Sequence, residues 1–132
     1  LASLEFKFNC WKVKKFSFEN LGVWNEVKLL TKDIYMVTKF FPNEEKYGLV
    51  SQIRRSIISL SSNIAEGSSR MSNKDQAHFY HIAFSSLMEV LSQLLISVEL
   101  DYIKETEVEK LREQIASAGY KINALRKAAL NR

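Results

Sequence analysis

The sequence predicts an all-α protein: an antiparallel up-down-up-down four-helix bundle with an extended N-terminal arm. Four stretches of the 132-residue chain carry apolar residues at spacings of three and four, the period of a helix with one buried face. One proline and four glycines leave few turns, so the elements are long. Four long helices with short connections pack as a bundle. We assign residues 1–17 to the arm and 18–132 to the bundle.

The arm has a pattern unlike the rest of the chain. Leu4, Phe6 and Phe8 alternate with polar residues, which is the period of a strand. Residues 11–18 continue as an aromatic-rich segment with interspersed lysines. The arm could dock on the bundle, pair with a second copy, or derive partly from the choice of start site.

The first two helices are predicted from their apolar stripes and from their ends. The first begins near Leu21 and ends before Pro42, because proline disfavours a helix immediately ahead of it. The second begins around Glu44 or Gly48 and ends at Gly67, a residue typical of helix C-termini. Their apolar stripes are Val27, Leu30, Ile34, Val37 and Phe41 in the first and Leu49, Ile53, Ile57, Leu60 and Ile64 in the second.

The last two helices have N-cap signals at their starts. Ser72 with Asp75 forms an approximate capping box before a helix over 73–100, and Thr106 with Glu109 begins the fourth helix. The third stripe is so wide that burial on two sides is expected. Its members are Phe79, Ile82, Ala83, Leu87, Val90, Leu91, Leu94 and Val98, with Met88, Leu95 and Ile96 off the stripe. The fourth stripe has heptad spacing: Leu111, Ile115, Ala118, Ile122, Leu125 and Ala129.

The second helix also carries a polar stripe opposite its apolar one. Small hydroxyl side chains and few charges leave room for a neighbour, so the sequence predicts an interface helix. The stripe consists of Arg55, Ser59, Ser62 and Glu66, flanked by Ser56 and Asn63.

A polar clasp between the second and third helices is predicted from Glu89 and Gln93. These residues lie one turn apart in the most apolar helix, where a carboxylate needs a partner. Arg54 or Arg55 of the preceding helix is the natural one. The alternative is that these two arginines are exposed and contact phosphates; we favour the clasp.

The charge distribution makes a polyanion a plausible partner. Nineteen basic and fifteen acidic residues give +4, and the basic ones gather in the arm and at the C-terminus. Arm aromatics between lysines could also stack on unpaired bases. The predicted nucleic-acid-binding residues are Lys12, Lys14, Lys15, Lys121, Arg126, Lys127 and Arg132.

The sequence argues against catalysis, a metal and a membrane. Asp75 and His78 share one helix turn, with His81 one turn further, but a di-iron bundle needs a second such motif. No phosphate-binding loop or nucleophile motif is present, so no enzyme activity and no cofactor are expected. No uninterrupted apolar run suits a membrane span or signal peptide, and a lone Cys10 excludes an intrachain disulfide. We expect a cytoplasmic protein.

From about Phe18 to Tyr102 the chain resembles a family of small four-helix-bundle proteins. They are encoded in intervening sequences of bacterial large-subunit ribosomal RNA genes and are sometimes labelled ribosomal proteins. The accessory variability protein of diversity-generating retroelements is a relative. Ser56, Ile57, Ser61 and Ser85 depart from the pattern. The matching residues are Phe18, Leu21, Trp24, Ile34-Tyr35, Phe41-Pro42, Glu45, Tyr47-Gly48-Leu49, Gln52, Arg54-Arg55, Ser59, Asn63-Ile64-Ala65-Glu66-Gly67, Arg70, Phe79, Ser86, Glu89 and Gln93.

The resemblance implies a ring-like homopentamer with no established enzymatic activity. In the retroelement relatives it implies association with RNA and a reverse transcriptase. Two functions follow as hypotheses. The first is a non-enzymatic oligomeric scaffold that binds nucleic acid, RNA above all, through basic surfaces. The second is a protein-interaction scaffold that binds a partner such as a polymerase without touching nucleic acid.

Overall fold

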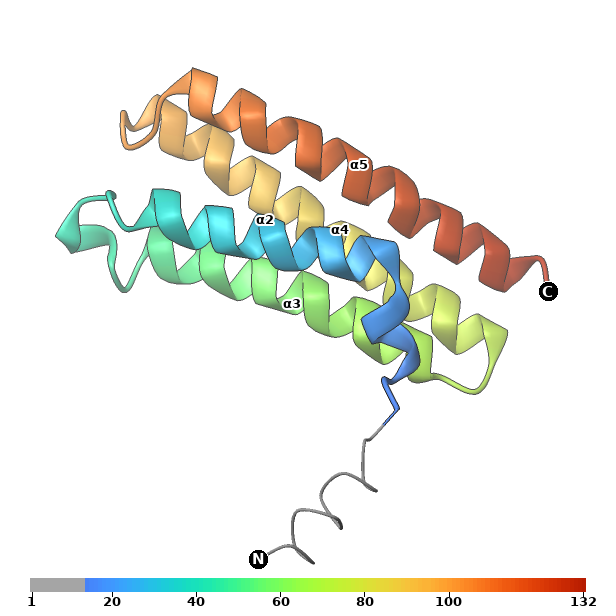
Figure 1. Cartoon of the computed structure of the whole chain (residues 1–132). Helices are drawn as coiled ribbons and strands as arrows, with labels where there is room; N and C mark the ends of the chain where they lie inside the picture. Colours follow the sequence, from blue (N-terminus) through green and yellow to red (C-terminus); the bar gives the residue numbers. More distant parts are fainter. Residues whose placement is uncertain (1–13) are drawn as a thin grey trace, which may run out of the picture.

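Four long helices form an antiparallel bundle in the computed structural model, which describes residues 14–132 (Figure 1). Helix α2 packs on α3 and α5, and α4 packs on the same two helices, so α2 and α4 lie diagonally across the bundle. The predicted all-α four-helix bundle is confirmed. The elements are η1 (Ser17–Asn20), α2 (Gly22–Thr38), η2 (Asn43–Glu45), α3 (Leu49–Ser69), α4 (Asn73–Glu99) and α5 (Glu105–Leu130), where η denotes a 3-10 helix.

The core consists of the apolar stripes that the sequence predicts. Each helix turns its three-four repeat inward, and the strand-like part of the predicted arm lies outside the described residues. The most completely buried large side chains are Val27, Leu30 and Ile34 of α2, Ile53, Ile57, Leu60 and Ile64 of α3, Leu87, Val90 and Leu94 of α4, and Val108 and Ile122 of α5.

The end of α2 and the start of α5 differ from the sequence prediction. Helix α2 ends at Thr38, so Phe41 is not helical, although it is buried and its ring lies 5.7 Å from that of Tyr102. Helix α5 begins one residue before Thr106: the Glu107 carboxylate accepts a hydrogen bond from the Lys104 N–H at 3.3 Å. The predicted cap of α4 is confirmed, because Ser72 Oγ accepts from the backbone N–H of Asp75 at 3.1 Å.

Gly67 does not end helix α3, contrary to the sequence prediction. The helix continues to Ser69, and none of the described glycines has a positive φ. Gly67 is buried against α4, where an added Cβ would lie 2.7 Å from Cε1 of Tyr80. This glycine is required because the two helices approach closely there, not because the backbone turns.

Helix α4 is central to the packing. It supplies eight buried residues and makes extensive contacts with both α3 and α5. Among the described residues it is the one helix long and apolar enough to cross a membrane by length and composition, a criterion that core helices also meet. Met88, Leu95 and Ile96, which the sequence places off the buried stripe, are exposed.

Candidate nucleic-acid interface

The polar side of α3 joins it to α4 through hydroxyl groups. Ser56 Oγ donates to the Glu89 carboxylate at 3.2 Å, and the hydroxyls of Ser59 and Ser86 lie 3.1 Å apart. Asn63 Nδ2 donates to the backbone oxygen of Ser59 at 2.8 Å. A polar clasp between these helices therefore exists: Ser56 with Glu89 and Ser59 with Ser86 make it, whereas Asn63 bonds within α3.

The predicted pairing of Arg54 or Arg55 with Glu89 is wrong, because neither arginine joins an ion pair within residues 14–132. Arg54 points toward α2, where its Nε donates to Thr38 Oγ1 at 3.1 Å and its Nη2 to the Tyr35 carbonyl at 3.3 Å. Tyr35 belongs to the last turn of α2, whose carbonyls lack the backbone N–H partners of the helix interior. Arg54 therefore caps the end of α2.

The other members of the predicted clasp and stripe are dispersed. Arg55 is exposed, and Glu66 forms an ion pair with Arg70 one turn later. The side-chain oxygen of Gln93 is buried without a hydrogen-bond partner among the described residues. These residues do not form one continuous interface within the chain.

Basic side chains from four parts of the chain meet at one end of the bundle. At this end the residues before η1, the end of α3, the start of α4 and the end of α5 come together (Figure 1). Hydrogen bonds join the neighbouring elements: Ser17 Oγ of η1 donates to Ser68 Oγ at 3.4 Å, Gln76 Nε2 to the Arg70 carbonyl at 3.1 Å, and Arg132 to Gln76 Oε1 at 3.1 Å. We call this set the basic end; it comprises Lys14, Lys15, Arg70, Lys74, Arg126, Lys127 and Arg132.

Most of the charge at the basic end is free. Lys14, Lys15, Lys74 and Lys127 are exposed, and none of them joins the three ion pairs found within residues 14–132. Arg70 is paired with Glu66, and its guanidinium lies 4.4 Å from the ring centre of Phe79. Four exposed lysines on adjoining elements make this end suited to phosphate groups.

The predicted nucleic-acid-binding residues divide into three groups. Lys14, Lys15, Lys127 and Arg132 lie together at the basic end, and Arg126 is half-buried there. Lys121 lies nearer the middle of α5, away from the basic end. Its Nζ is 2.7 Å from Glu26 Oε1, so this carboxylate of α2 neutralises its charge. Lys12 lies outside the described residues.

Sequence reasoning missed Lys74 as a phosphate-binding candidate. The signal that could have found it is a local excess of basic charge over residues 49–74, where Arg54, Arg55, Arg70 and Lys74 stand against Glu66 alone. Lys74 becomes relevant because Asn73 Nδ2 donates to the Arg132 backbone oxygen at 3.4 Å, which places the start of α4 beside the C-terminus.

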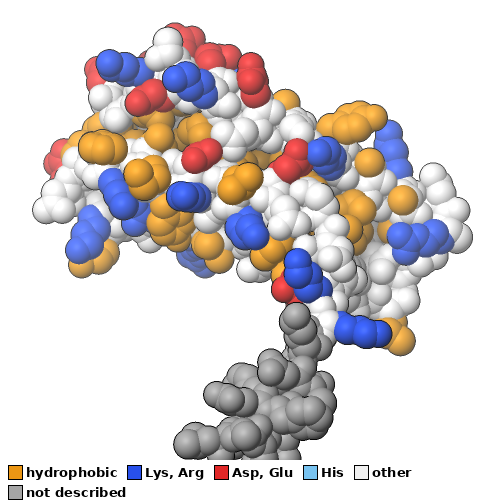
Figure 2. Space-filling view, in the orientation of Figure 1, with side chains coloured by type: hydrophobic (Ala, Val, Ile, Leu, Met, Phe, Trp, Pro, Cys, Tyr) orange, Lys and Arg blue, Asp and Glu red, His pale blue; other side chains and the backbone are white. Residues whose placement is uncertain are grey.

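The opposite end of the bundle is acidic. Figure 2 shows red side chains gathered over the first half of α5, away from the N-terminal residues. Glu105, Glu107, Glu109 and Glu113 are exposed there, and Asp101 lies in the turn before the helix. Basic side chains therefore gather at one end of the bundle and acidic side chains at the other.

Neither metal binding nor acid–base chemistry stands out among the described residues. No group of three His, Cys, Asp or Glu side chains within residues 14–132 is placed to hold a metal ion, and His78 and His81 are exposed. Burial raises the pKa of Tyr80 above its ordinary value of 10.0, an effect that the Arg132 charge partly offsets. Burial also raises the pKa of Tyr102, and Glu45 and Glu44 add to that rise.

Comparison with known proteins places this fold in a family. The family described as "23S rRNA-intervening sequence protein" matches residues 19–124. The chain belongs to this family. Within the solved structures, a Bacteroides thetaiotaomicron protein of unknown function from the S23 ribosomal protein family is similar in fold. It has 21% sequence identity and a TM-score of 0.73, with 80% of this chain and 98% of the other covered. Comparison with curated proteins finds no match.

The matched residues 19–124 comprise nearly all of the four-helix bundle, including Arg54, Gly67 and Tyr80. Most of the free lysines of the basic end lie in the bundle's margins: Lys14 and Lys15 precede the matched segment and Lys127 follows it. The family match therefore covers the bundle and excludes most of the lysines of the basic end.

Proposed function

We propose that the protein is a non-enzymatic homo-oligomeric scaffold that binds RNA through its basic end. The observation that carries the proposal is the meeting of Lys14, Lys15, Lys74 and Lys127 at one end, with no ion-pair partner among the described residues. Lysines attract phosphates without reading base edges. The binding is therefore electrostatic and largely independent of sequence.

Self-assembly is the second part of the proposal. Met88, Leu95, Ile96 and Leu100 expose apolar surface on α4 that a second copy of the chain could cover. Five subunits is the number that the resemblance implies. Repeating the basic end around an assembly would multiply the number of phosphates contacted at once.

The experiment is a fluorescence anisotropy titration of a labelled RNA hairpin at low salt. The charge-reversed variant Lys74→Glu/Lys127→Glu should lose at least tenfold in affinity, because both lysines belong to the basic end. The matched control is Lys110→Glu, an exposed lysine in the acidic half of α5, which should bind like the wild type. Equal losses in both variants, or no binding by the wild type, would overturn the proposal.

A protein-interaction scaffold is the competing function. The exposed apolar side chains of α4 favour it, since a partner protein could cover them. The same titration separates the two functions: a wild type that does not bind RNA at low salt would leave the protein partner as the better explanation.

A further inference from the structure

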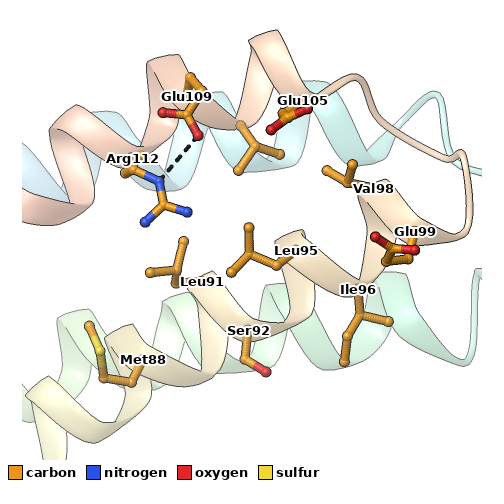
Figure 3. A pocket seen from close by; sticks show the side chains of 11 residues that line it. Met88, Leu91, Ser92, Leu95, Ile96, Val98, Glu99, Glu105, Glu109 and Arg112 are labelled. Atoms are coloured by element: carbon orange, nitrogen blue, oxygen red, sulfur yellow. Dashed lines mark hydrogen bonds and ion pairs between the residues drawn. The ribbon is translucent and has the colours of Figure 1, made fainter.

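An apolar groove with an acidic rim lies between α4 and α5, at the acidic end of the bundle. It has a volume of about 580 Å³. Leu91, Leu95 and Val98 lie between the two helices, with Glu105 and Glu109 on the α5 side (Figure 3). Three glutamates and one arginine line it: Glu99, Glu105, Glu109 and Arg112. Since Arg112 is already paired with Glu109 at 3.3 Å, the rim keeps a net negative charge.

The outer side of α2 has the opposite character. Lysines alternate there with exposed apolar side chains; Leu29 is 62% exposed, and Phe40, just after the helix, is 83% exposed. We call this surface the α2 lysine face. It consists of Lys28, Leu29, Lys32, Met36, Lys39 and Phe40.

No carboxylate lies on the α2 lysine face. Helix α2 has two acids, and both are engaged by α5. Glu26 accepts from Lys121 at 2.7 Å and from Ser117 at 3.2 Å, and Asp33 accepts from Gln114 at 3.1 Å. Lys28, Lys32 and Lys39 join none of the ion pairs within residues 14–132. The charge of the face is therefore available to an acidic partner.

The two surfaces match in length as well as in charge. The groove follows α4 from Met88 to Glu99, and the face runs from Lys28 to Phe40. At a helical rise of about 1.5 Å per residue, each extends roughly 17–18 Å. Because α2 and α4 lie diagonally across the bundle, one chain cannot bring its own face and groove together.

We propose that the α2 lysine face of one copy of this chain docks in the acidic-rimmed α4–α5 groove of a second copy. The inference rests on the self-assembly in the proposed function and specifies its interface. Two different surfaces meet, so the contact is head-to-tail, and repeating it gives a closed ring or an open chain. In the docked state the apolar side chains of both surfaces are buried from water, and the lysines of the face lie opposite the glutamates of the groove rim.

The test is a charge swap read by light scattering after size exclusion at micromolar concentration. Variant Lys32→Glu/Lys39→Glu makes the face acidic, and Glu99→Lys/Glu105→Lys makes the groove rim basic. Each variant alone should fall to about the 15.3 kDa mass of one chain, because like charges then meet. An equimolar mixture should recover at least twice that mass, because each altered surface again meets its opposite.

Controls separate this inference from the proposed function. Circular dichroism should show that both variants keep wild-type helicity, and Lys74→Glu/Lys127→Glu, altered only at the basic end, should keep the wild-type mass. An oligomer whose mass neither swap changes would overturn this interface alone. A wild-type monomer would overturn the self-assembly too. Unchanged mass with loss of RNA or anionic-vesicle binding in Lys32→Glu/Lys39→Glu would show a polyanion as the occupant.

Discussion

The guanidinium of Arg54 lies 4.5 Å from the ring centre of Tyr35 and donates to the backbone carbonyl of that same tyrosine at 3.3 Å. One side chain of α3 thus contacts both the ring and the last-turn backbone of α2. The positive charge also lies at the C-terminus of α2, where the helix dipole favours it. This contact fixes how the first two long helices cross.

Replacing Arg54 by alanine should lower the free energy of unfolding by about 2 kcal/mol. The loss reflects two hydrogen bonds from a charged donor, each half-buried, together with the stacking on Tyr35. Urea denaturation measures it. The matched control is the next residue: Arg55 is exposed, so Arg55→Ala should change stability by less than about 0.5 kcal/mol. Equal effects would contradict the capping role.

Replacing Gly67 by alanine should destabilise the fold by about 1–3 kcal/mol. Alanine normally stabilises a helix interior relative to glycine, but here the new methyl group would lie 2.7 Å from Cε1 of Tyr80. Gly119 of α5 is the control, since a Cβ there would meet Leu87 and Phe84 at 3.4 Å, an ordinary contact. Gly119→Ala should be neutral or stabilising in thermal denaturation. A stabilised Gly67→Ala protein would show that the close approach is absent.

Stability should fall as the pH rises above about 10, with Tyr80 contributing. Burial raises its pKa above 10.0, so above that pH the unfolded chain loses the phenolic proton before the folded one does. The stabilisation present below pH 10 is therefore lost on the alkaline side. Urea denaturation of the wild type and of Tyr80→Phe at pH 9 and 11 measures the contribution of Tyr80 to this loss. The free energy of unfolding of the phenylalanine variant should fall less from pH 9 to pH 11 than that of the wild type. An identical fall in both proteins would show that Tyr80 does not contribute to the alkaline loss of stability.

Replacing Asp101 by glycine should stabilise the protein by several tenths of a kcal/mol. Asp101 follows Leu100, the C-cap of α4, and lies in the left-handed region with φ of 61°. The Tyr102 N–H donates to the Ser97 carbonyl at 2.9 Å and the Asp101 N–H to Val98 at 3.0 Å, a Schellman motif whose preferred residue here is glycine. Thermal denaturation measures the gain. Asp101→Ala should destabilise instead, since alanine tolerates a positive φ poorly; stabilisation by alanine would contradict this explanation.

The helices and the core could be predicted because their signals are local. Repeats such as Ile53, Ile57, Leu60 and Ile64 require only the helical period. The sequence prediction for Gly67 is wrong because two kinds of glycine follow an apolar helical repeat in the same way. One kind ends the helix, and the other permits close packing of a second helix. Only the crossing of α3 and α4, with Tyr80 at the contact, distinguishes them.

The site was harder to predict because its members are far apart in the chain. Lys14, Lys74 and Lys127 are separated by more than fifty residues at each step, and only the bundle topology brings them to one end. The sequence predicts Arg54 or Arg55 as the partner of Glu89 because the arginines and the glutamate lie on adjacent helices, but the direction of the Arg54 side chain depends on the rotation of α3. That rotation aims it at the end of α2.

The most direct test of the central claim is the salt dependence of RNA binding by the wild-type protein. Anisotropy titrations with a duplex RNA between about 50 and 200 mM salt give log affinity against log salt. The four lysines at the basic end that join no ion pair within residues 14–132 should each neutralise one phosphate and release counterions. Each neutralised phosphate contributes roughly 0.7–0.9 to the slope, so a slope of about −3 or steeper is expected. A slope near zero, or no binding at the lowest salt, would contradict the account.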